Sequence, residues 1–144
     1  MINLPEIGYT PSDEDRASLE AWFAEYDEVS ARRDVERMTD MAAFPINLVS
    51  DDSNGDGRTA QWDRARLLEG MGHAMSEAGE GELSVESVRT PVFLSPSIAV
   101  VFSDSTMAVD GEKRQLRYVD ILVRQQGKWA YQTMIQPGWG DVMG

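Results

Sequence analysis

The sequence predicts an α+β fold with the element order α-α-β-β-α-β-β-β-β. In the first part of the chain, apolar residues recur at helical spacing. From about residue 83 onward, they alternate with period two between turn residues. The chain has 144 residues, of which 42% are hydrophobic and 26% are charged. This length and composition are typical of one globular domain, which we expect to span 1–144 with its core in 12–137.

The first two helices are predicted from their caps and apolar stripes. Thr10-Pro11-Ser12-Asp13 supplies a hydroxyl cap, a proline at the first helical position and acids in the first turn. We expect this helix to end near Arg32-Arg33, and Asp34 to cap a shorter helix that Pro45 stops. The two inward stripes are Leu19, Trp22, Phe23, Tyr26 and Val29, then Val35, Met38 and Met41.

A short β-hairpin and a third helix follow. Residues 46–50 and 58–62 read as strands on either side of a turn at 53–57, and a helix is predicted over about 63–78. The turn has the spacing of a calcium loop from Asp52, but Asp63 replaces the final glutamate and a strand precedes it. We therefore interpret it as a hairpin turn and expect no metal site.

The remaining strands are predicted over 83–94, 98–109 and the hairpin 115–137, whose register has two solutions. A two-residue turn at Gln126-Gly127 would place Val123 opposite Ala130, with the apolar sets of the two strands on opposite faces. A three-residue loop at 125–127 would instead pair Val123 with Trp129 and make one face continuously apolar. We favour the three-residue loop.

This register defines two faces of the final hairpin. The inner face would carry Arg117, Val119, Ile121, Tyr131 and Thr133, an apolar surface with a few polar groups, as in small-molecule pockets. The outer face would then mix apolar and polar groups, which suits a two-fold interface between copies of the chain. Its members would be Tyr118, Asp120, Leu122, Arg124, Ala130, Gln132 and Met134.

Charge and composition exclude several classes of protein. A net charge of −12 argues against nucleic-acid and anionic-membrane partners, which require clusters of Lys and Arg. The chain has no cysteine, and its single histidine with no G-x-S-x-G motif gives little support to a hydrolase triad. We expect His73 to lie at the surface or at a rim. The start lacks a basic segment followed by an apolar run, so we expect no signal peptide and a cytoplasmic protein.

The element order, together with Gly127-Lys128-Trp129 in the last turn, resembles the nuclear-transport-factor-like superfamily. This superfamily includes ketosteroid isomerase and the SnoaL-type polyketide cyclases. The resemblance covers nearly the whole chain from about residue 12. It implies a cone-shaped, curved, mostly antiparallel sheet wrapped around the N-terminal helices, an internal pocket, and a dimer formed sheet to sheet.

The resemblance also implies candidate catalytic residues. Counting back from the helix break at Asp34, the isomerase's oxyanion tyrosine falls on Tyr26. Its general base falls on Asp51 if one residue is inserted. The second oxyanion donor, a carboxylic acid on the penultimate strand, would have no counterpart, because Ile121 faces inward in the favoured register and Asp120 faces outward. Tyr26 could equally belong to the core stripe, and Asp51 could simply begin a polar turn.

Three functions remain open. The preferred one is binding of a small, largely apolar organic molecule without a cofactor. The expected pocket is lined by Trp22, Tyr26, Phe44, Leu48, Trp62, Val119, Tyr131 and Thr133, with Arg117 at its polar end. The first rival is an isomerase-like or cyclase-like enzyme that uses Asp51 and Tyr26 for proton abstraction next to a carbonyl. The second rival is a non-catalytic module that forms homodimers. Arg117 would either bind a carboxylate of the ligand or form a salt bridge to the acidic first helix.

Overall fold

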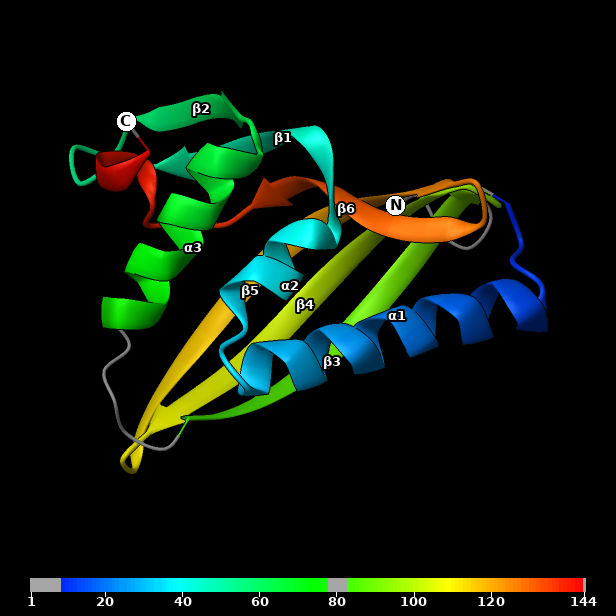
Figure 1. The fold of residues 1–144 in the computed structure, drawn as a ribbon, viewed down its shortest axis with the longest axis horizontal. Helices are drawn as coiled ribbons and strands as arrows, with labels where there is room; N and C mark the ends of the chain where they lie inside the picture. The colour runs from blue at the N-terminus through cyan, green and yellow to red at the C-terminus, as the bar shows by residue number, and fades with distance from the viewer. Residues whose placement is uncertain (1–8, 78–82, 144) are drawn as a thin grey trace, which may run out of the picture.

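The computed structural model describes residues 9–77 and 83–143, in which six strands form one sheet in the order β2-β1-β6-β5-β4-β3 (Figure 1). Strands β1 and β6 are parallel and the other neighbours are antiparallel, so the sheet is mixed. The strands are β1 (Ala42–Asp51), β2 (Gly57–Trp62), β3 (Leu83–Ser95), β4 (Ile98–Val109), β5 (Glu112–Gln125) and β6 (Lys128–Ile135). This α+β class and its element order confirm the prediction.

Three α-helices of the described residues pack against this sheet. They are α1 (Asp13–Ala31), α2 (Val35–Asp40) and α3 (Arg64–Glu77). Helices α1 and α2 lie over the long strands β3 to β5, whereas α3 lies beside the β1–β2 hairpin (Figure 1). A 3-10 helix, η2 (Gly140–Val142), contacts the same hairpin. Among the described residues, no helix has the length and apolar character needed to cross a membrane.

Helix α1 begins two residues later than a start at Pro11 would place it. The cap is Ser12, whose side chain accepts a hydrogen bond from the backbone of Asp15, while the Asp15 carboxylate accepts one from the backbone of Ser12. This reciprocal pair is a capping box, which satisfies two backbone donors at once and therefore outweighs a cap at Thr10. Asp34 caps α2 as predicted, by accepting a hydrogen bond from Arg37 N.

Pro45 does not end α2. The helix already ends at Asp40, and the chain enters β1 at Ala42, so that Pro45 lies inside the strand. The pairing of β1 with β6 shifts register between Ala42 and Asn47, around the proline, which has no backbone N–H to give to a ladder. Proline restricts the backbone of the residue before it, and here that restriction affects an irregular part of β1 and not the end of a helix.

The three-residue loop expected between β5 and β6 is wrong. The strands pair Gln125 with Lys128 and Val123 with Ala130, so the turn is the two residues Gln126 and Gly127. Both have positive φ, 53° and 78°, as a type I′ hairpin turn requires. A register shift between Ile121 and Leu122 then places Leu122 opposite Tyr131 and Ile121 opposite Thr133.

This register exchanges the two faces of β5. Leu122 is fully buried and packs in the core with Trp129 and Tyr131. Because side chains alternate along a strand, Asp120 and Arg124 share the inner face with Leu122, whereas Val119 and Ile121 lie on the outer face. The predicted common face for Val119, Ile121, Val123, Trp129 and Tyr131 is therefore wrong, and so is the predicted outer face containing Tyr118, Asp120, Leu122 and Arg124.

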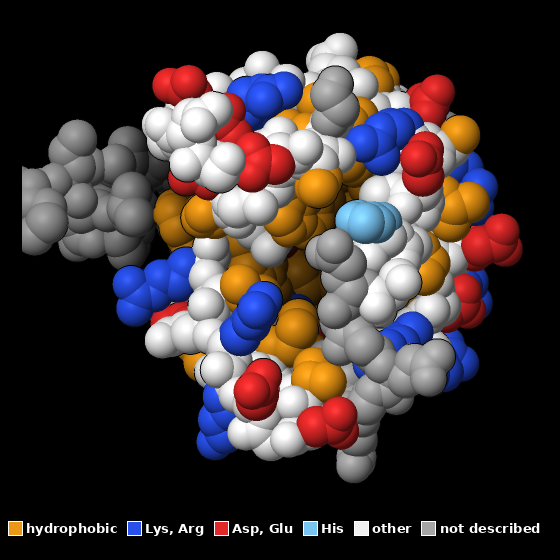
Figure 2. All heavy atoms as spheres, turned by 90° about the vertical axis from the view of Figure 1, so that its left-hand side faces the viewer, with side chains coloured by type: hydrophobic (Ala, Val, Ile, Leu, Met, Phe, Trp, Pro, Cys, Tyr) orange, Lys and Arg blue, Asp and Glu red, His pale blue; other side chains and the backbone are white. Residues whose placement is uncertain are grey.

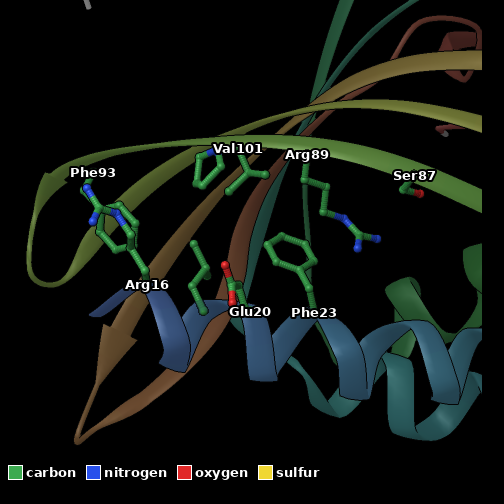
Figure 3. A pocket seen from close by; sticks show the side chains of 9 residues that line it. Arg16, Glu20, Phe23, Ser87, Arg89, Phe93 and Val101 are labelled. Atoms are coloured by element: carbon green, nitrogen blue, oxygen red, sulfur yellow. The ribbon is translucent and has the colours of Figure 1, made fainter. Parts of the chain in front are cut away.

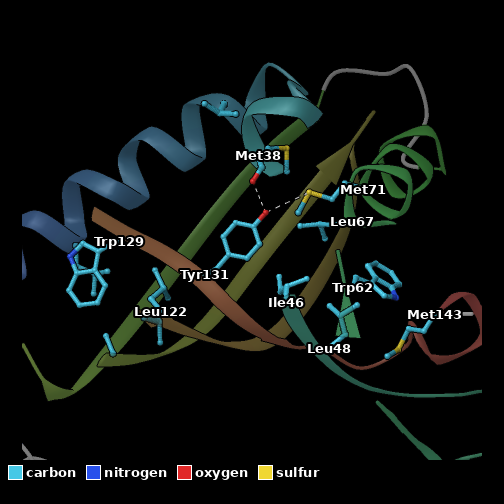
Figure 4. Close-up of a cluster of buried hydrophobic side chains, with 14 of the residues drawn as sticks. Met38, Ile46, Leu48, Trp62, Leu67, Met71, Leu122, Trp129, Tyr131 and Met143 are labelled. Atoms are coloured by element: carbon cyan, nitrogen blue, oxygen red, sulfur yellow. Dashed lines mark hydrogen bonds between the residues drawn. The ribbon is translucent and has the colours of Figure 1, made fainter. Parts of the chain in front are cut away.

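The core lies between the inner face of the sheet and the helices. Figure 4 shows Tyr131 pointing from β6 towards α2 and α3, where its hydroxyl donates a hydrogen bond to Met38 O and lies 3.9 Å from Met71 Sδ. The predicted stripe of α1 is confirmed, with Leu19 and Val29 buried and its aromatic residues packed against the core. Met143, which follows the expected core range, is buried as well.

Two arginines of the sheet hold α1 at its two ends. Arg124 of β5 lies 3.4 Å from the Asp15 carboxylate at the start of the helix, with its guanidinium 5.6 Å from the centre of the Trp129 ring. Arg89 of β3 binds Asp27 near the end of the helix through both Nη atoms, at 2.8 and 2.7 Å. The pKa of Asp15 is lowered, mainly by the hydrogen bond from Ser12 N and also by the charge of Arg124. These ion pairs fix the helix along the inner face.

Trp129→Ala should lower the free energy of unfolding by about 3–5 kcal/mol, because it empties a buried aromatic site. The Trp129 ring packs edge-on against Phe93 at 5.9 Å between centroids, and its Nε1 donates to Ser18 Oγ at 3.0 Å. Urea unfolding measures the change. Val142→Ala, at a residue of η2 that is 51% exposed, is the control and should stay within about 0.5 kcal/mol. Equal costs for the two variants would contradict the packing described above.

Candidate functional site

The middle of the inner face carries polar side chains from three neighbouring strands. Ser103 of β4 lies opposite Arg89 of β3 and Tyr118 of β5. In the adjacent row, the buried Val101 lies opposite Asp120. Polar groups in the interior are expensive unless they are hydrogen-bonded, so each of them requires a partner or a function.

Asp120 is the most perturbed of these groups. Burial raises the pKa of Asp120 to about 7, and the charge of Arg89 lowers it by a smaller amount. No hydrogen bond from the described residues contributes to this pKa. A carboxyl group that titrates near pH 7 can hold its proton and donate a hydrogen bond, or release the proton and act as a base.

Tyr26 of α1 lies close enough to Asp120 for the charge of that carboxyl group to affect its pKa. Its ring stacks on Trp22 at 5.4 Å and meets Tyr131 edge-on at 5.7 Å between centroids. Burial, followed by the charge of Asp120, raises the pKa of Tyr26 above its ordinary value of 10. The phenol therefore stays protonated at neutral pH. As for Asp120, no hydrogen bond from the described residues contributes to its pKa.

The neighbouring hydroxyl groups differ from Tyr26 because they are mostly paired. Tyr118 shares a hydrogen bond with Ser105 at 3.0 Å, and Ser105 shares another with Ser87 at 2.7 Å. Tyr131 is fixed by its bond to Met38 O. Ser103 Oγ is the exception, since it is buried without a hydrogen-bond partner among the described residues. Within the described residues, Tyr26 of α1 and Asp120 and Ser103 of this face are three polar side chains that make no hydrogen bond to the protein.

The molecule is hollowed on the side where α3 lies in Figure 1. Figure 2 shows this hollow end-on, with hydrophobic side chains along its walls and a histidine at its rim. His73 of α3 is the only histidine in the chain and is exposed, in agreement with the rim position expected from the sequence.

The structure brings together part of the predicted pocket. Trp22, Tyr26 and Tyr131 form one aromatic cluster, in which the Trp22 and Tyr131 rings are 6.0 Å apart. Leu48 and Trp62 are buried in the core. Thr133 is buried too, but it pairs with Ile121 and donates its hydroxyl hydrogen to Gln132 Oε1.

Other predicted pocket residues lie outside. Arg117 and Val119 are on the outer face, because the two-residue turn places the odd-numbered residues of β5 outward. The Arg117 side chain is 80% exposed, and its ion-pair partner is Asp104 of β4, at 3.7 Å, in place of the ligand or α1 acid that we had considered. Phe44 is exposed next to Pro45 in the irregular part of β1.

Asp51 is not placed beside Tyr26. It is exposed at the end of β1, and its carboxylate accepts a hydrogen bond of 2.7 Å from Gly138 N. Figure 1 shows this end of β1 beside η2, far from α1. The neighbouring Asp52 accepts hydrogen bonds from Asn54 N and Asp56 N, which completes the polar turn. Asp51 therefore binds the backbone of Gly138, and Asp52 stabilises the turn between β1 and β2.

Sequence reasoning missed Asp120 because it chose the wrong turn. The expectation that no acid occupies the inward position of the penultimate strand is corrected here, since Asp120 occupies it. The signal was available in the two-residue alternative, in which Val123 lies opposite Ala130. That alternative places even-numbered residues of β5 inward.

No protein-family model matches the sequence, and no curated protein matches it either. Solved structures match it in fold. An NTF2-like protein of unknown function from Pseudomonas putida superposes with a TM-score of 0.72 at 13% identity, over 89% of this chain and 89% of that one. The chain has the NTF2-like fold. This confirms the superfamily resemblance at the level of fold.

Two further structures share the NTF2-like fold with this chain. Aln2 from a Streptomyces species gives a TM-score of 0.70 at 13% identity, over 88% of this chain and 92% of that one. A putative calcium/calmodulin-dependent protein kinase II association domain from Xanthomonas campestris gives 0.65 at 18% identity, over 99% and 100%. Identities this low establish a shared fold but no shared activity, so the function has to be argued from the site.

The free energy of unfolding should fall as pH rises from about 4 to about 7. The native protein holds the Asp120 proton up to about pH 7, whereas the unfolded chain releases it near pH 3.8. The stabilising effect of this proton is therefore complete below pH 3.8 and lost above pH 7, and it amounts to at most about 4 kcal/mol.

Urea unfolding of Asp120→Asn across this pH range tests the assignment. The variant should lose this part of the pH dependence and gain stability relative to the wild type at pH 8. Asp110→Asn, at an exposed acid of the β4–β5 turn, is the matched control and should follow the wild type. Parallel curves for the wild type and Asp120→Asn would show that Asp120 is ionised in the native protein throughout.

Proposed function

We propose that the protein binds a small, largely apolar organic molecule in the hollow between sheet and helices, and holds one oxygen atom of it with Tyr26 and Asp120. The observation that carries this proposal is the pairing of a phenol and a carboxyl group on facing elements, neither hydrogen-bonded within the described residues. Both groups are half-buried, and polar side chains in such positions without a partner inside the protein are available to bind a ligand.

The protonation states define the oxygen that fits. Tyr26 is protonated at neutral pH, and Asp120 keeps its proton up to about pH 7. Two neutral donors suit an acceptor oxygen, such as that of a ketone, an enol or a phenol, better than an ammonium or an ester of phosphate. The hydrophobic walls in Figure 2 suit the apolar remainder of the molecule.

The resemblance to ketosteroid isomerase supports binding more than catalysis. With β5 in its observed register, Tyr26 and Asp120 match the isomerase's two oxygen-binding positions. Asp51, the match to the general base, holds Gly138 N and is exposed. Asp51 is therefore not placed to serve as the base at this site, which favours binding over isomerase-like catalysis.

Proton transfer by Asp120 itself is the second candidate function. A base is most effective when its pKa approaches the working pH, and burial raises the pKa of Asp120 to about 7. An enzyme of this type would exchange the α-hydrogens of a bound ketone with deuterium from solvent. Exchange that is faster with wild-type protein than with Asp120→Asn, under saturating ketone, would favour this function over binding alone.

A ketone probe tests the binding proposal. 2-Acetylnaphthalene should bind about tenfold more tightly than 2-ethylnaphthalene, which lacks the oxygen, and Tyr26→Phe should remove most of this difference. Fluorescence titration gives both affinities. The affinity for the ketone should fall as pH rises through about 7, because an ionised Asp120 no longer donates a hydrogen bond. Asp120→Asn should bind independently of pH in this range. Equal affinities for the two probes would contradict the proposal.

The outer face of the sheet supports a homodimer as an accompanying proposal. In the observed register this face carries Val88, Val92, Ile98, Val100, Phe102, Val119, Ile121 and Val123. Val88, Ile98 and Phe102 are exposed. An apolar patch on an uncovered sheet face suits a two-fold contact with the same patch of a second copy. The match to a putative association domain fits this use of the fold.

Sedimentation measures this self-association. The wild type should be a dimer at high micromolar concentration, and Phe102→Asp should be a monomer, because it places a charge in the centre of the patch. Ser76→Asp adds the same charge on the exposed side of α3 and should leave the dimer intact. A wild type that sediments only as a monomer would contradict the proposal.

A further inference from the structure

A second pocket lies between α1 and the edge strand β3. Figure 3 shows side chains of the helix and of the strand facing each other across this pocket, which has a volume of about 270 Å³. Leu19, Phe23, Phe93 and Val101 form its apolar part. Neither Tyr26 nor Asp120 lines it, so it is distinct from the site proposed above.

Two guanidinium groups line this pocket, although the chain has a net charge of −12. Arg16 projects from α1 with its side chain 53% exposed, and its ion pair with the exposed Asp13 is a loose one at 3.7 Å. Arg89 projects from β3 with 16% of its side chain exposed. Glu20 is the acid among the lining residues. A pocket with an apolar floor and two guanidinium groups suits an anion attached to an apolar body.

The surroundings of Arg89 indicate that the anion bound in this pocket is a carboxylate. Its two Nη atoms bind the two oxygens of Asp27, and its guanidinium lies 4.3 Å from the centre of the Phe23 ring. The planar fork is therefore already arranged for a carboxylate. The Asp27 side chain is 51% exposed, so it can turn into solvent when a ligand carboxylate takes its place on Arg89. Arg89 Nε is buried without an acceptor among the described residues, which leaves the guanidinium incompletely satisfied.

We propose that this pocket binds a small carboxylate with an apolar body, with the carboxylate on Arg89. Figure 3 shows Arg16 beside Phe93 at the other end of the pocket, from where its charge adds a longer-range attraction. The pocket volume of about 270 Å³ lies just below the range of about 300–1,000 Å³ that is typical of drug-sized ligands. The occupant is therefore a small acid with one aromatic ring or a short alkyl chain. The apolar body packs on Phe23 and Phe93, and the carboxylate replaces Asp27 on the Arg89 fork. This proposal does not depend on the one made for the hollow.

The probe is 3-phenylpropionate, and its neutral control is 3-phenylpropionamide. Titration of each into isotope-labelled protein, followed by backbone amide NMR, gives both the affinity and the location of binding. We expect shifts in residues 16–23 of α1 and 87–93 of β3. The amide should bind about tenfold more weakly or worse, because it lacks the charge-assisted bonds to the Arg89 guanidinium.

Four variants sharpen the test. Arg89→Lys keeps the charge but loses the fork, and should weaken binding about tenfold. Arg16→Gln, at an exposed position that folding does not require, should weaken it severalfold. Asp27→Asn should strengthen binding, because it removes the carboxylate that competes for Arg89. Arg114→Gln makes the same charge change as Arg16→Gln on exposed β5 and should have no effect.

The outcomes separate this site from the hollow. Asp120→Asn should leave the affinity for 3-phenylpropionate unchanged, whereas it changes the pH dependence of ketone binding. Equal affinities for the acid and its amide would overturn the proposal. Shifts centred on α3 and β5 would overturn it too, as would an unchanged affinity in both Arg16→Gln and Arg89→Lys.

Discussion

The arrangement of the interior depends on a turn of two residues. Gln126 and Gly127, both with positive φ, are the only residues between the paired ends of β5 and β6. This turn length determines which side of β5 faces the helices. The register shift beyond Leu122 then brings the Trp129 and Tyr131 side of β6 under the same helices. A loop longer by one residue would exchange every side chain of β5 between the two faces. The inward position of Asp120 is therefore a consequence of backbone geometry at a site about six residues away.

The inner face combines two environments that are normally kept apart. Its end near the turn is a conventional core, in which Leu122 and Trp129 pack against α1. Its middle holds a carboxyl group, phenols and serine hydroxyls beneath the same helix. Such a distribution costs stability, since burial alone raises the pKa of Asp120 by opposing its charge. Proteins tolerate this cost at sites that recognise or transform another molecule.

The features that could be predicted from the sequence are those that local interactions determine. The helical stripe of α1, the cap at Asp34 and the element order follow from spacing and from single residues, and the structure confirms them. The register of β5 could not be decided in this way, because the apolar alternation of Val119, Ile121 and Val123 suits a buried face and a partner-covered outer face equally well. Asp120 was missed for that reason. The bond between Arg89 and Asp27 joins residues 62 positions apart, and such a pair is visible only once the sheet and helix are assembled.

The two arginines that hold α1 have a consequence for the response to ionic strength. Helix α1 carries many acids and a single cation, Arg16, so its exposed carboxylates repel one another. Arg124 and Arg89 attract the helix to the sheet through Asp15 and Asp27, beneath or beside aromatic rings. Mobile ions screen exposed charges far more than partly buried pairs. Added salt therefore relieves the repulsion along the helix more than it weakens its attachment, so this acidic protein holds its first helix more firmly in concentrated salt than in dilute buffer.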